Sequence, residues 1–331
     1  MKIALIAFTE QGKALADRLA LALGGVADRC GGDDALGPWT ARHFDSADGL
    51  IFVGAAGIAV RAIAPHIRSK AKDPAVVVVD ERGTYAVPIL SGHLGGANAL
   101  ARRVAEVCGA QAVITTATDR NGVFPVDEWA RVQGCDVPFP DRIKAVSARL
   151  LAGGTIRVFS PWPVEGAVPA GVEPAEPGTP CDVRLTVRRE ETDALVLVPR
   201  ILVLGVGCRR DTPAERIESF FVRFLERNGF REEAVCLVCS IDLKAREPGL
   251  LAFCQGRALA FKTFPAGALA PLEGDFASSD YVRRVTGVDN VCERSAAAGS
   301  RGGALLCRRE AGDGITMALA ERPFRPDWRY S

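Results

Sequence analysis

The chain has 331 residues, of which 48% are hydrophobic and 24% charged, and this composition is typical of a soluble globular protein with more than one domain. Its 41 basic and 40 acidic residues leave a net charge of +1, so no global field favours nucleic acid or an acidic membrane. The first apolar run, residues 3–8, is too short for a signal-peptide core, and no run of about 18 apolar residues follows. We therefore expect a cytoplasmic protein that binds any anion through local groups.

Four short apolar runs alternate with helical patterns in the first 134 residues. They cover residues 3–8, 49–54, 75–80 and 111–115. The third run contains four consecutive valines, which indicates a strand buried on both faces and hence a parallel sheet under helices. The sequence therefore predicts a Rossmann-like α/β domain with a mainly parallel sheet over residues 1–134.

The most informative stretch is residues 87–101, where an apolar run stops at Ser91-Gly92 and His93 follows. Gly95-Gly96 then precede a helical pattern from residue 97. Glycines allow a ligand to approach the backbone, a helix N-terminus offers N–H donors to an anion, and an imidazole exchanges a proton near neutral pH. The alternative is a tight strand-to-helix turn in which His93 fills a polar gap.

Several polar tips are expected to meet at one edge of this sheet. Open α/β sheets bind ligands beyond the carboxyl ends of their strands, so residues 54–57, 80–81, 91–98 and 118–119 are expected to ring one crevice. For each acidic residue alone, a solvated loop position or a helix cap is the competing interpretation.

The rest of the chain predicts a small middle unit and a last α/β domain with a mixed sheet. The middle region, residues 135–199, contains a Pro/Gly-rich stretch at 161–180 that is expected to be a connection between domains or a long hairpin loop. Candidate strands follow at 182–188 and 194–198. The last domain covers residues 200–322, and a polar tail, 323–331, is expected to fray.

The last domain opens with an apolar strand, Gly205-Val-Gly207, and then Arg209 and Arg210. Residues 212–215, Thr-Pro-Ala-Glu, predict a capping box at the start of the next helix. This order would clamp a carboxylate or phosphate. The dinucleotide fingerprint lacks its last glycine and no Walker loop occurs, so a nucleotide-dependent Rossmann enzyme is the less favoured alternative.

Ten cysteines are present, but an intracellular chain of this length does not need disulfides. Cys236 and Cys239 lie three apart on an expected strand and so face opposite sides of it. We therefore expect the protein to have no metal site of its own.

Two sets of motifs resemble a known family. Residues 54–61, 80–83, 90–98 and 117–119 resemble the amino-terminal domain of the cobalt-precorrin-5A hydrolase (CbiG) family. A second set resembles the carboxyl-terminal domain of that family and also CobE, a free-standing protein of the oxygen-requiring cobalamin pathway. This set comprises residues 205–210, 240–244 and 286–294.

The resemblance implies a cytoplasmic hydrolase of anaerobic cobalamin biosynthesis. Such an enzyme opens the δ-lactone of cobalt-precorrin-5A and releases acetaldehyde to give cobalt-precorrin-5B. The cobalt is carried by the tetrapyrrole substrate, so no cofactor of the protein's own is expected. Neighbouring pathway methyltransferases and a homodimer are candidate partners. The alternative is a non-catalytic tetrapyrrole-binding or delivery protein.

Lactone opening needs an activated water, an oxyanion site and a proton shuttle. Our hypothesis is that His93 is the general base, that Glu81 or Asp119 orients it or acts as a second acid/base, and that the amides after His93 hold the oxyanion. The residues expected to bind the substrate and its carboxylate arms are Gly54, Gly57, Arg61, Ser91, Gly92, Gly95, Gly96, Asn98, Thr118, Arg209, Arg210 and Lys244.

Overall fold

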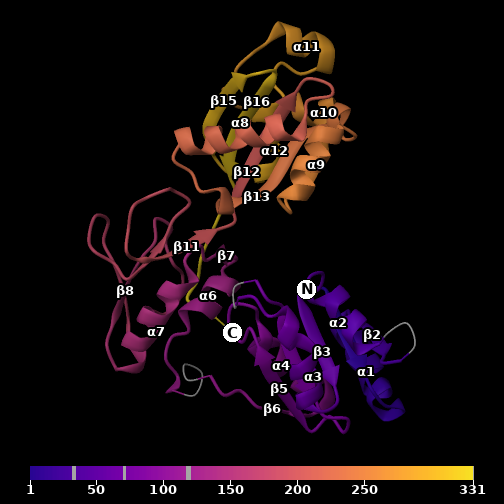
Figure 1. Cartoon of the computed structure of the whole chain (residues 1–331). Coiled ribbons are helices and arrows are strands. Elements are labelled where there is room, and N and C mark those ends of the chain that lie inside the picture. Colours follow the sequence, from indigo (N-terminus) through magenta and orange to yellow (C-terminus); the bar gives the residue numbers. More distant parts are fainter. Residues whose placement is uncertain (32–34, 70–71, 117–120, 331) are drawn as a thin grey trace.

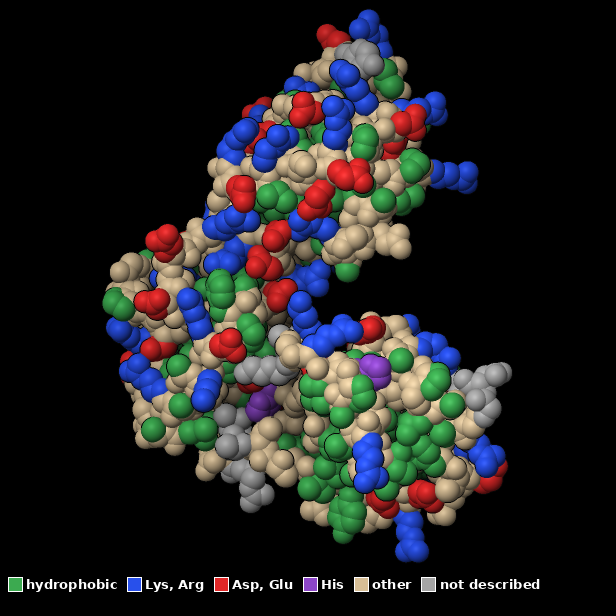
Figure 2. All heavy atoms as spheres, in the orientation of Figure 1, with side chains coloured by type: hydrophobic (Ala, Val, Ile, Leu, Met, Phe, Trp, Pro, Cys, Tyr) green, Lys and Arg blue, Asp and Glu red, His purple; other side chains and the backbone are tan. Residues whose placement is uncertain are grey.

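The computed structural model describes residues 1–31, 35–69, 72–116 and 121–330. Within these residues the strands form three sheets, which follow one another along the chain. The three units trace a curved path, so that the last unit stands apart from the first (Figure 1). Figure 2 shows the resulting hollow between them. The expected mixed α/β fold is confirmed, with a mainly parallel first sheet and a mixed last sheet.

The first sheet has the strand order β2-β1-β3-β4-β5-β6 and is covered by helices on both faces. Helices α1 and α4 bury one face, and α2 and α3 bury the other. The strands are β1 (Ile3–Ala7), β2 (Val26–Arg29), β3 (Gly49–Val53), β4 (Ala75–Val79), β5 (Tyr85–Leu90) and β6 (Gln111–Ala112). The helices are α1 (Glu10–Leu23), α2 (Leu36–Phe44), α3 (Ala56–Ile63), the short η1 (Ala64–His66) and α4 (Ala97–Cys108).

Two neighbouring strands of this sheet, β5 and β6, run opposite to the other four. β1, β2, β3 and β4 are parallel, whereas β5 pairs antiparallel with β4 and β6 then runs parallel to β5. Only five residues separate β4 from β5, and a chain that short can form a hairpin but not a parallel crossover. The carboxyl ends of β4 and β5 therefore lie at opposite edges of the sheet.

The second sheet has the order β7-β11-β10-β8-β9 and packs against α6 and α7. Its elements are α6 (Val126–Val132), β7 (Cys135–Asp136), η2 (Pro140–Arg142), α7 (Ile143–Leu151), β8 (Ile156–Phe159), β9 (Val172–Pro174), β10 (Val183–Leu185) and β11 (Leu195–Pro199). The expected strands near 182–188 and 194–198 are confirmed as β10 and β11. The stretch 161–180 does not connect domains, because β9 within it pairs with β8 of this same sheet.

The third sheet has the order β14-β13-β12-β16-β15, in which β16 is antiparallel to β12. Helices α8 and α9 bury one face, and α12 packs on the other. The strands are β12 (Leu202–Cys208), β13 (Val235–Ile241), β14 (Ala260–Phe264), β15 (Leu305–Gly312) and β16 (Ile315–Glu321). The helices are α8 (Ala214–Arg227), η3 (Glu232–Ala234), η4 (Asp242–Lys244), α9 (Pro248–Gly256), α10 (Ala266–Leu269), α11 (Asp280–Thr286) and α12 (Cys292–Ser300).

The Gly-x-Gly motif of the third unit serves packing and lies inside β12. A Cβ on Gly205 would stand 1.8 Å from the carbonyl oxygen of Cys292, so only glycine lets α12 approach the strand. The predicted capping box is wrong: α8 begins at Ala214 without a side-chain cap, and the Thr212 hydroxyl donates to the Arg209 carbonyl at 2.7 Å. The Thr212 side chain therefore binds a carbonyl of its own turn and does not cap the N–H groups of α8.

The expectation that the tail frays is also wrong. After β16 the chain returns to the middle unit and ends beside α6 (Figure 1). Trp328 is only 6% exposed and stacks on Trp129 of α6, with ring centroids 5.1 Å apart. The Trp129 indole donates to the Asp327 carbonyl at 2.7 Å. Burial of large aromatic rings therefore holds a segment whose other residues are mostly polar.

Candidate active site

The predicted single crevice is wrong, because the antiparallel β5 divides its residues between two edges of the first sheet. Gly54 and Glu81 follow the carboxyl ends of β3 and β4, and Gly57 lies in α3 beyond that same edge. His93 follows β5 and lies at the other edge, where Leu90 pairs with Val76 near the start of β4. The length of β4, about 13 Å, separates the two edges, since a strand rises about 3.3 Å per residue. Glu81 therefore cannot orient His93.

The structure instead places His93 against Asp127, a residue of α6 in the middle unit. The His93 Nδ1 and Asp127 Oδ2 atoms are 3.4 Å apart, and the two side chains are only 11% and 14% exposed. Asp127 lies in the first turn of α6, where a carboxylate is favoured by the helix dipole. An imidazole whose Nδ1 faces a carboxylate is held in one orientation and directs Nε2 toward a reacting group.

A second charged group lies at the same joint between the first and middle units. Glu128 follows Asp127 on α6, and its side chain is 3% exposed. Its Oε1 atom lies 3.7 Å from Arg102 Nη1 on α4 and 3.5 Å from Arg131 Nη2 on α6. The position of a Cβ on Gly96 would be 3.5 Å from the Arg131 side chain, so this arginine covers the glycine loop.

These joint residues were missed by sequence reasoning. In the sequence, Asp127 and Glu128 indicate no more than the start of a helix, because acidic residues are common in a first turn. Their distance of more than 30 positions from His93 hides the contact in the sequence. An acidic pair beside a buried tryptophan, Trp129, was the one available signal that this helix face packs inward.

The loop before α4 uses most of its amides internally. The N–H groups of Gly96, Ala97 and Asn98 donate to the carbonyls of His93, Ser91 and Gly92 at 2.9–3.0 Å. The expected oxyanion donor at Gly96 is therefore occupied. The Gly95 amide has no partner among the residues that the structure describes.

Ser91 has a left-handed backbone, with φ of 56°, and its hydroxyl is buried without a hydrogen-bond partner within the described part of the chain. A Cβ on Gly95 would lie 2.3 Å from the Ser91 Cβ, so glycine at this position allows the loop to close over the serine. Asn98 is 1% exposed, and its Nδ2 donates to the Thr116 hydroxyl at 3.1 Å, which ties α4 to the segment after β6. Ser91 and Asn98 thus fix the conformation of the loop from its buried side.

The predicted Thr118 and Asp119 fall outside the described residues.

The other predicted cations are not gathered around His93. Arg61 lies exposed in the last turn of α3. Arg209 and Arg210 follow the far end of β12, about 20 Å from the end that joins the middle unit, at 3.3 Å per residue. Lys244 Nζ is paired with Glu247 Oε2 at 2.8 Å, and both side chains are largely buried. These residues do not form one clamp with the glycine loop.

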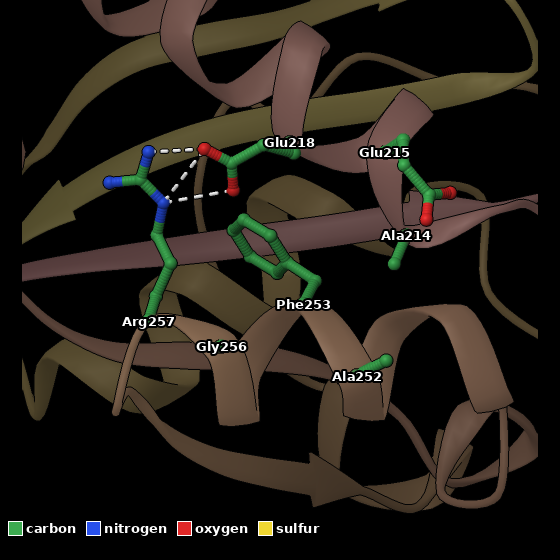
Figure 3. A pocket seen from close by; sticks show the side chains of 7 residues that line it. All are labelled: Ala214, Glu215, Glu218, Ala252, Phe253, Gly256 and Arg257. Carbon is green, nitrogen blue, oxygen red and sulfur yellow. Dashed lines mark hydrogen bonds and ion pairs between the residues drawn. The ribbon is translucent and has the colours of Figure 1, made fainter.

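A surface pocket of about 510 Å³ lies elsewhere, between α8 and α9 of the third unit (Figure 3). Its main charged groups pair with each other: the Arg257 Nε donates to both carboxylate oxygens of Glu218 at 3.0 and 2.9 Å. Arg257 also pairs with Glu232 outside the pocket. With its guanidinium satisfied by protein carboxylates, this pocket offers no free cation to a ligand.

Two further observations concern metal binding and membrane-spanning helices. Among the described residues, no three His, Cys, Asp or Glu side chains are arranged to hold a metal ion. No described helix combines the length and the apolar character that crossing a membrane requires.

Comparisons with known proteins identify the family. The cobalamin synthesis G amino-terminal model matches residues 38–119, and the cobalamin synthesis G carboxyl-terminal model matches residues 202–320. The chain is 36% identical to cobalt-precorrin-5A hydrolase of Salmonella typhimurium, covering 96% of this chain and 97% of that protein. It is 32% identical to the enzyme of the same name from Priestia megaterium, covering 85% and 80% of the two chains.

The third unit has a separate relative. The chain is 35% identical to protein CobE of a Sinorhizobium species, over 36% of this chain and 79% of that one, a share close in length to the third unit. The expected similarity to CobE is therefore confirmed. Since the full-length identities cover most of both chains, the protein belongs to the cobalt-precorrin-5A hydrolase family of cobalamin biosynthesis.

Proposed function

We propose that this protein hydrolyses cobalt-precorrin-5A, opening its δ-lactone and releasing acetaldehyde to give cobalt-precorrin-5B. The supporting comparison is the 36% identity, over 96% of the chain, to an enzyme of that name. The supporting observation in the structure is the pair of His93 and Asp127, an imidazole and a carboxylate 3.4 Å apart at a joint between two units. A carrier protein would not need such a proton-transfer pair, so catalysis is favoured over delivery.

His93 acts as the general base in this proposal. It removes a proton from water, the water oxygen bonds to the lactone carbonyl carbon, and the ring C–O bond breaks. The resulting imidazolium returns the proton to the departing alkoxide, so no net charge is left on the protein. Asp127, whose carboxylate faces Nδ1, stabilises the imidazolium and takes the orienting role first assigned to Glu81. Asp119 remains a candidate second acid/base from the sequence.

The amide of Gly95, which has no partner among the described residues, is the proposed donor to the developing oxyanion. It lies in the same tight loop as His93, and its neighbours Gly96 and Ala97 are already committed to backbone carbonyls. A rigid donor of this kind is aimed before reaction and needs little reorganisation during it.

In this proposal the cobalt arrives inside the substrate, the protein supplies no cofactor, and the reaction takes place in the cytoplasm. Association with neighbouring pathway methyltransferases and formation of a homodimer remain predictions. Sedimentation of the purified protein, alone and mixed with those methyltransferases, would test both.

The decisive experiment measures acetaldehyde release from cobalt-precorrin-5A. We expect His93→Gln and His93→Ala to lower kcat at least about 100-fold, the usual range for loss of a general base. His66→Gln is the matched control, because His66 lies in η1 and packs on Phe44 away from the joint. Near-wild-type release by His93→Gln would reject the base assignment. A wild-type protein that only shifts the visible spectrum of the substrate would establish the delivery alternative.

A further inference from the structure

Three arginines meet at the base of the third unit, where it joins the rest of the molecule. Arg200 precedes β12, Arg301 follows α12 and Arg322 follows β16. The Arg322 N–H donates to the Ile201 carbonyl at 2.8 Å, and its Nε donates to the Gly299 carbonyl at 3.3 Å. The three segments are thus held together by short contacts, although their arginines lie up to 122 positions apart in the sequence.

This arginine cluster, Arg200, Arg301 and Arg322, lacks acidic partners. Within the described ranges no carboxylate lies at ion-pair distance from any of the three, whereas Arg257 and Arg294 of the same unit are both paired. Arg200 and Arg301 are also exposed to solvent. Like charges gathered without a counter-charge repel one another, and an anion that binds among them removes that repulsion.

A partly buried thiol lies beside these segments, because Val235, its neighbour in β13, pairs with Leu202 at the start of β12. Cys236 lies at the start of β13, and burial raises the pKa of its thiol. The positive charges of Arg322, Arg200 and Arg301 oppose that rise, as expected for arginines on this side of the sheet. This supports the backbone contacts in placing the arginines in one cluster.

The cluster lies within reach of the candidate active site. The Arg200 N–H donates to the Gly134 carbonyl at 3.2 Å, and Gly134 follows α6, the helix that carries Asp127. Gly134 lies seven positions after Asp127, which corresponds to about 10 Å along a helix axis. Figure 2 shows Lys and Arg side chains at the inner corner of the hollow, where the third unit meets the others.

We propose that Arg200, Arg301 and Arg322 form a subsite for the carboxylate side chains of the tetrapyrrole, with its lactone at His93. This rests on the proposed function and locates its substrate. Acetate and propionate arms are flexible carboxylates, and guanidinium groups bind such groups through paired hydrogen bonds. The subsite replaces the clamp first expected from Arg209, Arg210 and Lys244. The substrate would then lie in the hollow between the first and third units, because His93 belongs to the first unit and the arginines to the third.

The test uses the full chain with Arg200→Gln and Arg301→Asn. Asparagine suits position 301 because that residue has a left-handed backbone, with φ of 59°. For each variant we expect KM for cobalt-precorrin-5A to rise about tenfold, which corresponds to the loss of one charge-assisted contact, and kcat to change less than about twofold. Arg200→Lys should recover part of the loss. Arg216→Gln, an exposed arginine on α8, is the matched control.

Binding is measured separately by titrating the substrate and following its visible spectrum. Weaker binding by both variants, with a smaller difference from wild type at high salt, supports the subsite. A double variant that combines Arg200→Gln with Arg301→Asn completes the test. Unchanged KM and unchanged binding in this double variant would overturn the subsite, as would a loss of kcat at constant KM. If wild-type protein binds the substrate but releases no acetaldehyde, the proposed function fails, and the titration alone then decides the subsite.

Discussion

Two regions of the molecule carry motifs that resemble the family, and their chemistry differs. In the third unit, the segment 286–294 forms a closed network around Glu293, which is fully buried. Its carboxylate accepts hydrogen bonds from the Ala277 and Arg309 amides, both at 2.7 Å, and from Asn290 Nδ2 at 2.9 Å. Every strong donor around this carboxylate is used to hold the fold.

The joint between the first and middle units is built differently. His93 and Asp127 come from separate units, remain partly exposed and are 3.4 Å apart rather than tightly bonded. A carboxylate surrounded by fixed backbone donors cannot exchange protons without breaking the fold, whereas an imidazole beside a carboxylate can. The comparison teaches that the same resemblance covers one region that maintains the architecture and another that is suited to catalysis.

The largest expected effect tests the architectural region. Glu293→Ala leaves two partly buried backbone N–H groups without their acceptor and opens a gap at a fully buried position, and we expect it to lower the free energy of unfolding by about 3 kcal/mol. Denaturant unfolding measures the change, with Glu273→Ala, an exposed position, as the control. The folded fraction should retain the wild-type kcat. A stable Glu293→Ala protein with a low kcat would place Glu293 in the chemistry instead.

The next effect tests the joint. Asp127→Asn keeps the size of the side chain but removes the charge that stabilises the His93 imidazolium, so kcat should fall about 100-fold with little change in unfolding free energy. Acetaldehyde release across a pH series measures it. Asp141→Asn, which changes an exposed aspartate of η2, is the control. A kcat within a few-fold of wild type would show that the His93–Asp127 contact is only structural.

A smaller effect is expected from the tail that supports α6. Trp328→Leu keeps an apolar side chain but loses the ring stacked on Trp129, and we expect a loss of about 1 kcal/mol in unfolding free energy. Trp328→Phe, which keeps an aromatic ring, should lose less. Thermal unfolding of the two variants measures the difference. If both are as stable as wild type, the tail does not stabilise the joint.

The smallest effect concerns the edge of the first sheet opposite His93. Burial alone would raise the pKa of the Asp80 carboxyl, but hydrogen bonds from the Tyr85, Thr84 and Arg82 amides outweigh it and hold the pKa below the usual 3.8. The stability that this carboxylate contributes is therefore present above pH 3.8 and lost as the pH falls through the lower folded-state pKa.

Asp80→Asn should accordingly be slightly less stable than wild type at neutral pH, and the difference should vanish in acid. Urea unfolding at a series of pH values measures this, with Glu81→Gln as a neighbouring control whose carboxylate accepts no hydrogen bond from described residues. A stability difference that stays constant down to the lowest pH would show that the carboxylate charge is not its cause.

The sequence by itself determined the types of element and the class of fold. Hydrophobic periodicity is local, so the buried strands β3 and β4 and the turn at residues 91–96 could be predicted from neighbouring residues. It also identified His93 as the titratable group of that turn. Strand direction was less accessible, although the short connection between β4 and β5 already favoured a hairpin.

Only the tertiary structure decided which groups meet. The pairing of His93 with Asp127, the return of Trp328 to α6 and the contact of Arg322 with the Ile201 carbonyl join segments far apart in the chain. Such contacts depend on how whole units pack, and the packing energy is summed over many side chains. A pattern of neighbouring residues therefore cannot predict them. The residues of the turn were therefore readable from the sequence, whereas their partners required the folded chain.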